Sequence, residues 1–155
     1  MNEDGFELKI ACDKLANLCI ESVSITEYNE TCGIFAKAAK SIAQECSDLD
    51  GDVVYISGFL HDIRRIEGRM QMRHSMCGYS FLSQRGYDDA ARIALTHSFV
   101  IPDIRVYAGQ PDCTDNELAL IKNYLDNVIY NNYDKLIQLC DAIALPEGVC
   151  LMRKG

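Results

Sequence analysis

The stretch Asp52-Val53-Val54-Tyr55-Ile56-Ser57-Gly58-Phe59-Leu60-His61-Asp62 decides the fold class of this 155-residue chain. Its β-branched residues would suit a buried strand, but Asp52 is a good helix cap and Gly58 weakens a strand as much as a helix. Because helical patterns flank the stretch on both sides, we predict a helix from Val53 to Asp62.

Six further segments carry helical spacing or capping signals. Thr114 to Glu117 matches the capping box and is the clearest helix start. Pro102, Gly109 and Pro111 break any period between residues 99 and 113, and a loop of this length could cover a site. The six segments are about 7–23, one through Phe35 that stops near Cys46, 75–84 with Gly86 as a C-terminal cap, 88–98, 114–129 and 133–145. We therefore predict an all-α bundle of about seven helices, with no clear strand.

Length and composition indicate one domain over residues 1–155, with a core of about 30–148 and the N-terminal helix packed on it. Eight cysteines without a Cys-x-x-Cys pair, several on apolar helical faces, indicate reduced core residues. Met1 to Gly5 carries acids rather than a secretory signal, and no apolar run approaches the ~18 residues of a membrane span. We expect a cytoplasmic protein with no membrane partner.

A formal net charge of −8 argues against a nucleic-acid polymer or an anionic membrane as partner. Four of the eight arginines, however, fall within ten consecutive residues: Arg64, Arg65, Arg69 and Arg73. This segment is a local place that could hold an anion.

The chain has three histidines, and one of them, His61, precedes Asp62 near the end of the apolar helix. A carboxylate there is costly unless it is paired or coordinated, so the pair either binds a divalent ion or Asp62 bridges to a nearby arginine. Asp141 lies in the apolar run 136–144 and has the same problem. Shared coordination would solve it for both, and the alternative for Asp141 is a surface or capping aspartate.

The run Gly58 to Ile63 closely resembles the signature of the HD superfamily of metal-dependent phosphohydrolases. The run 136–144 looks like the later helix of that family, whose aspartate completes the metal site. His74 and His97 look like the additional histidines of two-metal subfamilies, and their alternative is ordinary hydrogen-bonded packing. The chain departs from the pattern of this family at Thr31, which stands where relatives carry a first histidine.

The resemblance implies a divalent ion held by His61, Asp62, His74, His97 and Asp141, with Mn, Fe, Zn, Ni or Mg suited to these ligands. It implies hydrolysis of a small phosphorylated substrate, with nucleotides among the candidates, by a metal-activated water. Asp62 and Arg65 would be catalytic, and Arg65, Arg73 and Lys135 would bind the substrate. The alternative is that these arginines pair with surface acids such as Glu67.

Two other functions are consistent with the same sequence. A degenerate HD domain would bind a phosphorylated ligand or a protein partner without catalysis, which Thr31 favours. A plain helical scaffold would require a local partner for every polar residue in an apolar helix. The sequence sets no oligomeric state, and a homodimer is among those it allows.

Overall fold

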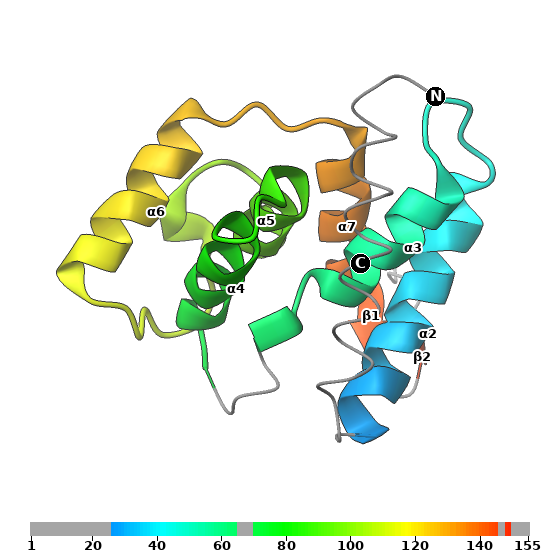
Figure 1. The fold of residues 1–155 in the computed structure, drawn as a ribbon, viewed down its shortest axis with the longest axis horizontal. Coiled ribbons are helices and arrows are strands. Elements are labelled where there is room, and N and C mark those ends of the chain that lie inside the picture. Colours follow the sequence, from blue (N-terminus) through cyan, green and yellow to red (C-terminus); the bar gives the residue numbers. More distant parts are fainter. Residues whose placement is uncertain (1–25, 65–69, 146–147, 150–155) are drawn as a thin grey trace, which may run out of the picture.

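The computed structural model describes residues 26–64, 70–145 and 148–149, and these form a helical bundle (Figure 1). Its six α-helices correspond to six of the seven predicted ones, and the all-α prediction is confirmed. The predicted helix over about 7–23 lies outside the described residues. Within the described part, no helix is both long and apolar enough to cross a membrane. The elements are α2 (Thr26–Ala43), α3 (Gly51–Leu60), α4 (Arg73–Ser83), α5 (Asp88–Thr96), the short 3-10 helix η2 (Ile104–Val106), α6 (Asp115–Asn127), α7 (Asn132–Ile143) and the strands β1 (Ala144–Leu145) and β2 (Gly148–Val149).

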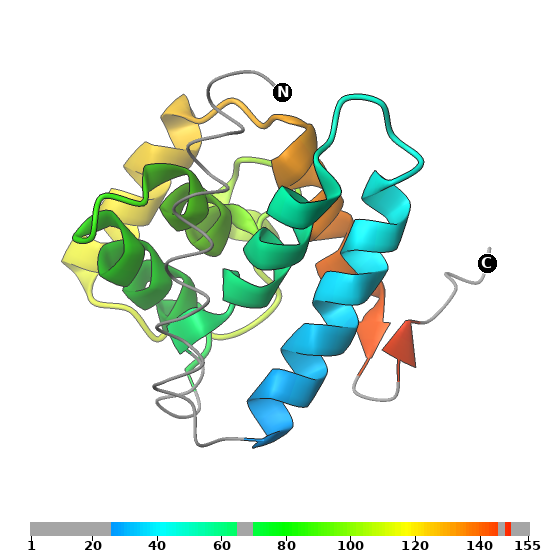
Figure 2. The same ribbon diagram turned by 45° about the vertical axis from the view of Figure 1, so that its right-hand side comes forward.

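The bundle consists of two helical hairpins joined by α7. Helices α2 and α3 lie side by side, as do α4 and α5 (Figures 1 and 2). Helix α7 contacts α2, α3 and α5, so it packs between the hairpins. Helix α6 lies at the outer edge and packs through Ile121 and Leu125 against Leu95 and Phe99.

Helix α3 is apolar on almost every side, which is typical of a helix buried on all faces. Its start differs from the prediction, since Asp50 rather than Asp52 is the cap. The Asp50 carboxylate accepts hydrogen bonds from the backbone N–H groups of Asp52 (2.9 Å) and Val53 (3.1 Å). Gly58 lets α2 approach, because a Cβ there would lie 3.1 Å from the Phe35 ring.

Two predicted helix boundaries are found in the structure. Gly86 has φ of +78°, the left-handed backbone that glycine adopts easily after a helix, and its N–H donates to Ser83 O (2.9 Å). The Thr114 hydroxyl accepts from Glu117 N–H (3.2 Å), and the Glu117 carboxylate accepts from Thr114 N–H (2.8 Å). This reciprocal pair is the predicted capping box.

The predicted end of the last helix is wrong by two residues. Helix α7 ends at Ile143, and Ala144–Leu145 pairs antiparallel with Gly148–Val149. Pro146 follows in the sequence, and a proline disfavours helical backbone in the residue before it. Extended backbone at Leu145 pairs with Gly148, which adds a two-stranded ribbon that we did not predict.

Candidate metal centre

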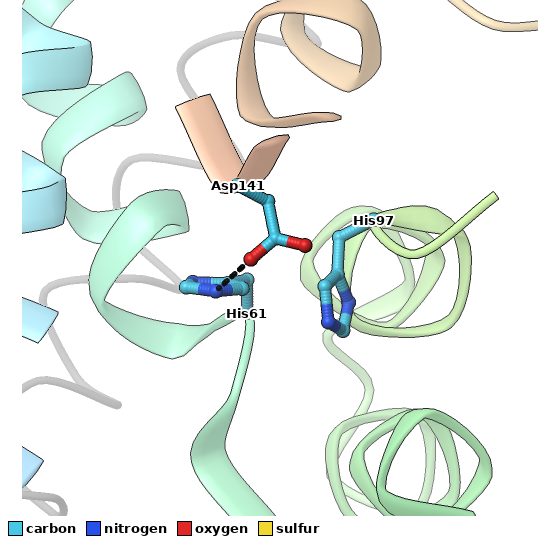
Figure 3. A group of neighbouring side chains, drawn as sticks. All are labelled: His61, His97 and Asp141. Carbon is cyan, nitrogen blue, oxygen red and sulfur yellow. Dashed lines mark ion pairs between the residues drawn. The ribbon is translucent and has the colours of Figure 1, made fainter. Parts of the chain in front are cut away.

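Side chains from four helical segments converge at one place in the bundle. His61 and Asp62 follow the end of α3, His74 lies in the first turn of α4, His97 caps α5 and Asp141 comes from the last turn of α7. Two groups each bring three ligand atoms within 4.8 Å of one another: His61, His97 and Asp141, which Figure 3 shows, and Asp62, His74 and His97. We call these five side chains the histidine–aspartate cluster.

Asp62 lies at the centre of the cluster. Its Oδ1 atom is 3.1 Å from His74 Nε2 and 3.3 Å from His97 Nε2, whereas Oδ2 is 3.6 Å from His61 Nε2. Asp141 Oδ1 lies 3.5 Å from the same nitrogen of His61 (Figure 3). Asp62 thus directs one carboxylate oxygen toward His74 and His97 and the other toward His61, and both oxygens would be available to a cation.

The three imidazoles are all oriented in the same way. Each Nδ1 contacts the backbone carbonyl three residues earlier, which is Gly58 for His61, Gln71 for His74 and Ala94 for His97. A carbonyl only accepts hydrogen bonds, so each Nδ1 carries a hydrogen and each Nε2 faces the cluster. There Nε2 offers a lone pair when the ring is neutral and an N–H group when the ring is protonated. Metal-ligating histidines are held by this kind of contact through the other ring nitrogen.

The contact between His74 and His97 tests whether a cation fits. Their Nε2 atoms are 3.0 Å apart. With hydrogen on both Nδ1 atoms, two lone pairs face each other, and this contact is unfavourable unless a proton or a cation lies near both nitrogens. Together with two carboxylates, this donor set fits a divalent ion.

Burial and the mutual interactions of the cluster residues shift their pKa values. Only 4% of His61 is exposed, 2% of His74 and 3% of His97. Burial disfavours the ionised form of Asp62, but the three imidazoles outweigh it and hold the pKa of Asp62 well below its ordinary value. Burial also disfavours the ionised form of Asp141, but His61 and His97 together outweigh it and lower the pKa of Asp141. Burial likewise opposes charge on His61, yet Asp62 and Asp141 raise its pKa. Both carboxylates are therefore ionised at neutral pH and attract a cation.

Two neighbours that we did not predict hold the histidines in place. The Phe35 ring stacks on the His61 ring, with centroids 4.2 Å apart. The Gln138 side-chain amide donates to Thr96 O and Phe99 O, both at 3.2 Å, and so ties α7 to the end of α5 that carries His97. The signal for Gln138 was present in the sequence, since it is a polar residue in the same apolar run as Asp141.

The other predicted site residues do not join the described cluster. Arg65 and the side chain of Thr31 lie outside the described residues. Arg73 is half-exposed, and its Nε lies 3.5 Å from Glu117 on α6. Lys135 is exposed and precedes Asp141 by six residues in α7. The two residues are therefore about 9 Å apart along the helix axis and about 120° apart around it. The substrate-binding roles of these residues remain predictions.

Comparison with known proteins gives one match. The HD domain family model matches residues 30–145. No curated protein and no solved structure matches the chain. The family match spans most of the chain and includes all five residues of the histidine–aspartate cluster. The chain therefore belongs to the HD domain family.

Proposed function

We propose that the protein is a metal-dependent phosphohydrolase that acts on a small phosphorylated compound, with nucleotides as the first candidates. The observation that carries the proposal is the convergence of three imidazole nitrogens and two carboxylates in an HD domain. None of the five side chains is a thiolate, so the donor set suits Mn, Fe, Zn, Ni or Mg.

The residues of the cluster would have two roles, which are to bind the metal ion and to orient the attacking water. His61, His74, His97, Asp62 and Asp141 would hold the ion. When bound, a divalent ion would lower the pKa of a water to about 7, which makes that water nucleophilic at neutral pH, and would stabilise charge on the phosphoryl oxygens. The side chains of Asp62 and Asp141 are 19% and 37% exposed, so these two carboxylates are the parts of the cluster that can accept a hydrogen bond from that water and orient it.

A second candidate function follows from Thr31, which occupies the position where relatives carry the first histidine. A domain short of this ligand could keep the pocket and bind a phosphorylated compound or a protein partner without turnover. Binding without hydrolysis distinguishes this function from the first.

The test measures metal content and activity in the same preparations. Protein purified without chelator is analysed for bound metal and assayed against a panel of nucleotides and phosphate esters. We expect bound metal and turnover in the wild type. Loss of a side chain around a metal ligand usually costs 10–100-fold, so Asp62→Ala and Asp141→Ala, which remove ligands themselves, should lower activity by at least about 100-fold. Both should also lose metal.

Asp126→Ala is the matched control, because Asp126 is an exposed aspartate on α6 that pairs with Lys122 at 2.6 Å. It should keep the metal and the activity of the wild type. Binding of a phosphate ester without metal or turnover would favour the second candidate. Unchanged metal content in His61→Ala and in both aspartate variants would remove the proposed site.

A further inference from the structure

The three histidines of the cluster are oriented by two different kinds of backbone. His61 and His97 are the C-caps of α3 and α5, and their Nδ1 atoms contact carbonyls in the last turns of those helices. The hydrogen bonds of a helix hold such carbonyls in a fixed direction. His74 lies instead in the first turn of α4, and its Nδ1 contacts Gln71 O, which precedes the helix. The acceptor for this histidine therefore needs support from another part of the chain.

The long loop between α5 and α6 supplies that support. The Asp112 carboxylate accepts from Gln71 N–H and from Arg73 N–H, both at 2.8 Å, so it holds the backbone on both sides of the Gln71 carbonyl. The Gln71 side chain accepts from Gln110 N–H at 2.7 Å. The N-cap residue of α4, Met72, makes no side-chain cap hydrogen bond, and the loop takes its place. The loop thus fixes the peptide group that orients the histidine.

Gly109 lets the loop come this close to the start of α4. A Cβ at this position would lie 2.8 Å from Gln71 Oε1 and 2.7 Å from the Tyr107 ring, so the Gln71 side chain or the ring would have to move. The next residue, Gln110, donates its N–H to the same Gln71 oxygen. A residue larger than glycine would therefore disturb the contact that ties the loop to Gln71.

His74 belongs to one of the two groups of ligand atoms in the cluster. Its Nε2 lies 3.1 Å from Asp62 Oδ1 and 3.0 Å from His97 Nε2, and we call these three residues the His74 group. The other group, which we call the Asp141 group, consists of His61, His97 and Asp141. Its side chains come from α7 and from the ends of α3 and α5. A shift of the loop therefore acts on the His74 group first.

We propose that Asp112 is a positioning residue for His74, and that the loop sets the affinity of the His74 group for a divalent ion through Gln71. The Asp141 group, whose ligands are oriented by helices, keeps its affinity when the loop is released. This inference rests on the metal centre of the proposed function, but it requires no hydrolysis.

The first test follows the orientation of His74 without metal. Histidine labelled with ¹⁵N marks only three rings in the full chain, and NMR measures how fast each Nδ1 hydrogen exchanges with water. Asp112→Ala should speed the exchange at His74 by about tenfold, as expected for the loss of a helix cap, and leave His61 and His97 unchanged. Asp112→Asn keeps one carbonyl oxygen as acceptor, so its exchange rate should lie between those of the wild type and Asp112→Ala.

Asp103→Ala is the matched control. Asp103 lies in the same loop and accepts from Arg105 N–H at 2.9 Å, where it caps η2 rather than α4. This variant should leave the exchange at all three rings as it is in the wild type. Gly109→Ala keeps the Asp112 carboxylate but crowds Gln71, so it should change the exchange at His74 in the same direction as Asp112→Ala.

The second test titrates Zn²⁺ into the labelled chain and reads the Nε2 signals of His74 and His61 separately. Loss of a residue that orients a metal ligand usually costs 10–100-fold in affinity, and Asp112 acts through Gln71, so we expect the lower end of this range. Asp112→Ala should weaken the zinc binding reported by His74 by about tenfold and leave that reported by His61 unchanged. Asp103→Ala should bind zinc as the wild type does.

The outcomes separate this inference from the proposed function. Zinc binding that Asp112→Ala does not weaken, or weakens equally at His74 and His61, would overturn the inference alone. Absence of zinc binding in the wild type would overturn the metal centre and the inference with it. Zinc binding that Asp112→Ala weakens only at His74, in a protein without turnover, would reject the phosphohydrolase function and support the inference.

Discussion

Asp134 shows how this bundle accommodates a charge in its interior. Its side chain is 0% exposed, and its carboxylate accepts from Arg92 Nε at 3.0 Å and from Asn131 N–H at 2.8 Å. Arg92 also contacts Asp89 at 2.8 Å. Burial opposes charge on Arg92, but Asp134 prevails and raises its pKa. The ion pair joins α5 to α7 and leaves the buried carboxylate satisfied.

Removal of the Asp134 carboxylate should destabilise the fold. Asp134→Ala leaves Arg92 without its buried partner, and the loss of one member of a buried pair costs about 3–5 kcal/mol. The Arg92 side chain is 19% exposed and can turn partly toward water, so we expect the lower end of that range. Urea denaturation measures the free energy of unfolding.

The matched control for this prediction is Asp126→Ala, which breaks the exposed pair with Lys122 and should cost less than about 1 kcal/mol. The double variant Arg92→Ala with Asp134→Ala should recover part of the loss, because no unpaired charge remains. An equal loss of unfolding free energy in Asp134→Ala and Asp126→Ala would show that the buried Arg92–Asp134 pair stabilises the fold no more than the exposed pair does.

Single residues were the most predictable part of the site. His61, Asp62 and Asp141 could be identified because ionisable groups in apolar helices need a partner. The same reasoning applies equally to Asp134 and Gln138, whose partners turn out to be an arginine and two backbone carbonyls. Sequence alone therefore points to buried polar residues, but only the geometry separates candidate cation ligands from structural residues.

At the scale of elements, the long loop between α5 and α6 fastens the start of α4. Asp112 accepts from the backbone N–H groups of Gln71 and Arg73, both at 2.8 Å. The Gln71 side chain accepts from Gln110 N–H at 2.7 Å, and the Gln71 carbonyl accepts from His74 Nδ1. The loop thus supplies the cap that Met72 cannot provide. It also orients a histidine of the cluster through Gln71.

The contribution of Asp112 should depend on pH. Burial opposes its ionised form, but the hydrogen bonds from the N–H groups of Gln71 and Arg73 together outweigh burial and lower the pKa of Asp112. A group whose pKa is lower in the folded state stabilises the fold above its unfolded pKa of about 3.9, and that contribution disappears as the pH falls through the folded value. Asp112→Ala should therefore lower the free energy of unfolding by about 0.5–2 kcal/mol at pH 7, the usual cost of losing a helix cap.

The difference between the wild type and Asp112→Ala should shrink as the pH is lowered from 7 to about 3, when the carboxyl group becomes protonated. Urea denaturation across this range measures it. Asp126→Ala, which caps no helix, should show no comparable pH-dependent difference. A constant difference between wild type and Asp112→Ala at all pH values would contradict a role for the ionised carboxylate.

Element types could be predicted well, and element ends less well. The capping box formed by Thr114 and Glu117 lies within four consecutive residues, so sequence alone identifies it. Asp48 and Asp50 precede α3 and Asp52 lies in its first turn. The choice of cap among them depends on a distant contact, because Asp50 N–H donates to the Tyr133 hydroxyl at 3.0 Å. The strands β1 and β2 have two residues each, too few for an alternating pattern to be visible.

At the scale of the whole molecule, the cluster lies where both hairpins meet α7. Helix α3 with its following turn, α4, α5 and α7 each supply at least one of the five side chains. His61 and Asp141 are eighty residues apart in sequence, and no local pattern could show that they lie 3.5 Å apart. Their meeting depends on the contacts of α7 with α2, α3 and α5. A cation bound there would cross-link four segments of the fold.

This arrangement predicts that metal removal lowers the thermal stability of the protein. An ion that binds only the folded state, present at about 100 times its dissociation constant, stabilises that state by about 2.7 kcal/mol. For a domain of this size, that corresponds to roughly 5–11 °C in Tm. Melting curves with and without chelator, followed by return of Mn, Fe, Zn, Ni or Mg one at a time, measure the shift and identify the ion that restores it. Asp141→Ala removes one of the segments from the cross-link, so its Tm should respond little to any of these ions. Identical wild-type curves with and without every ion would show that the four segments are held by packing alone.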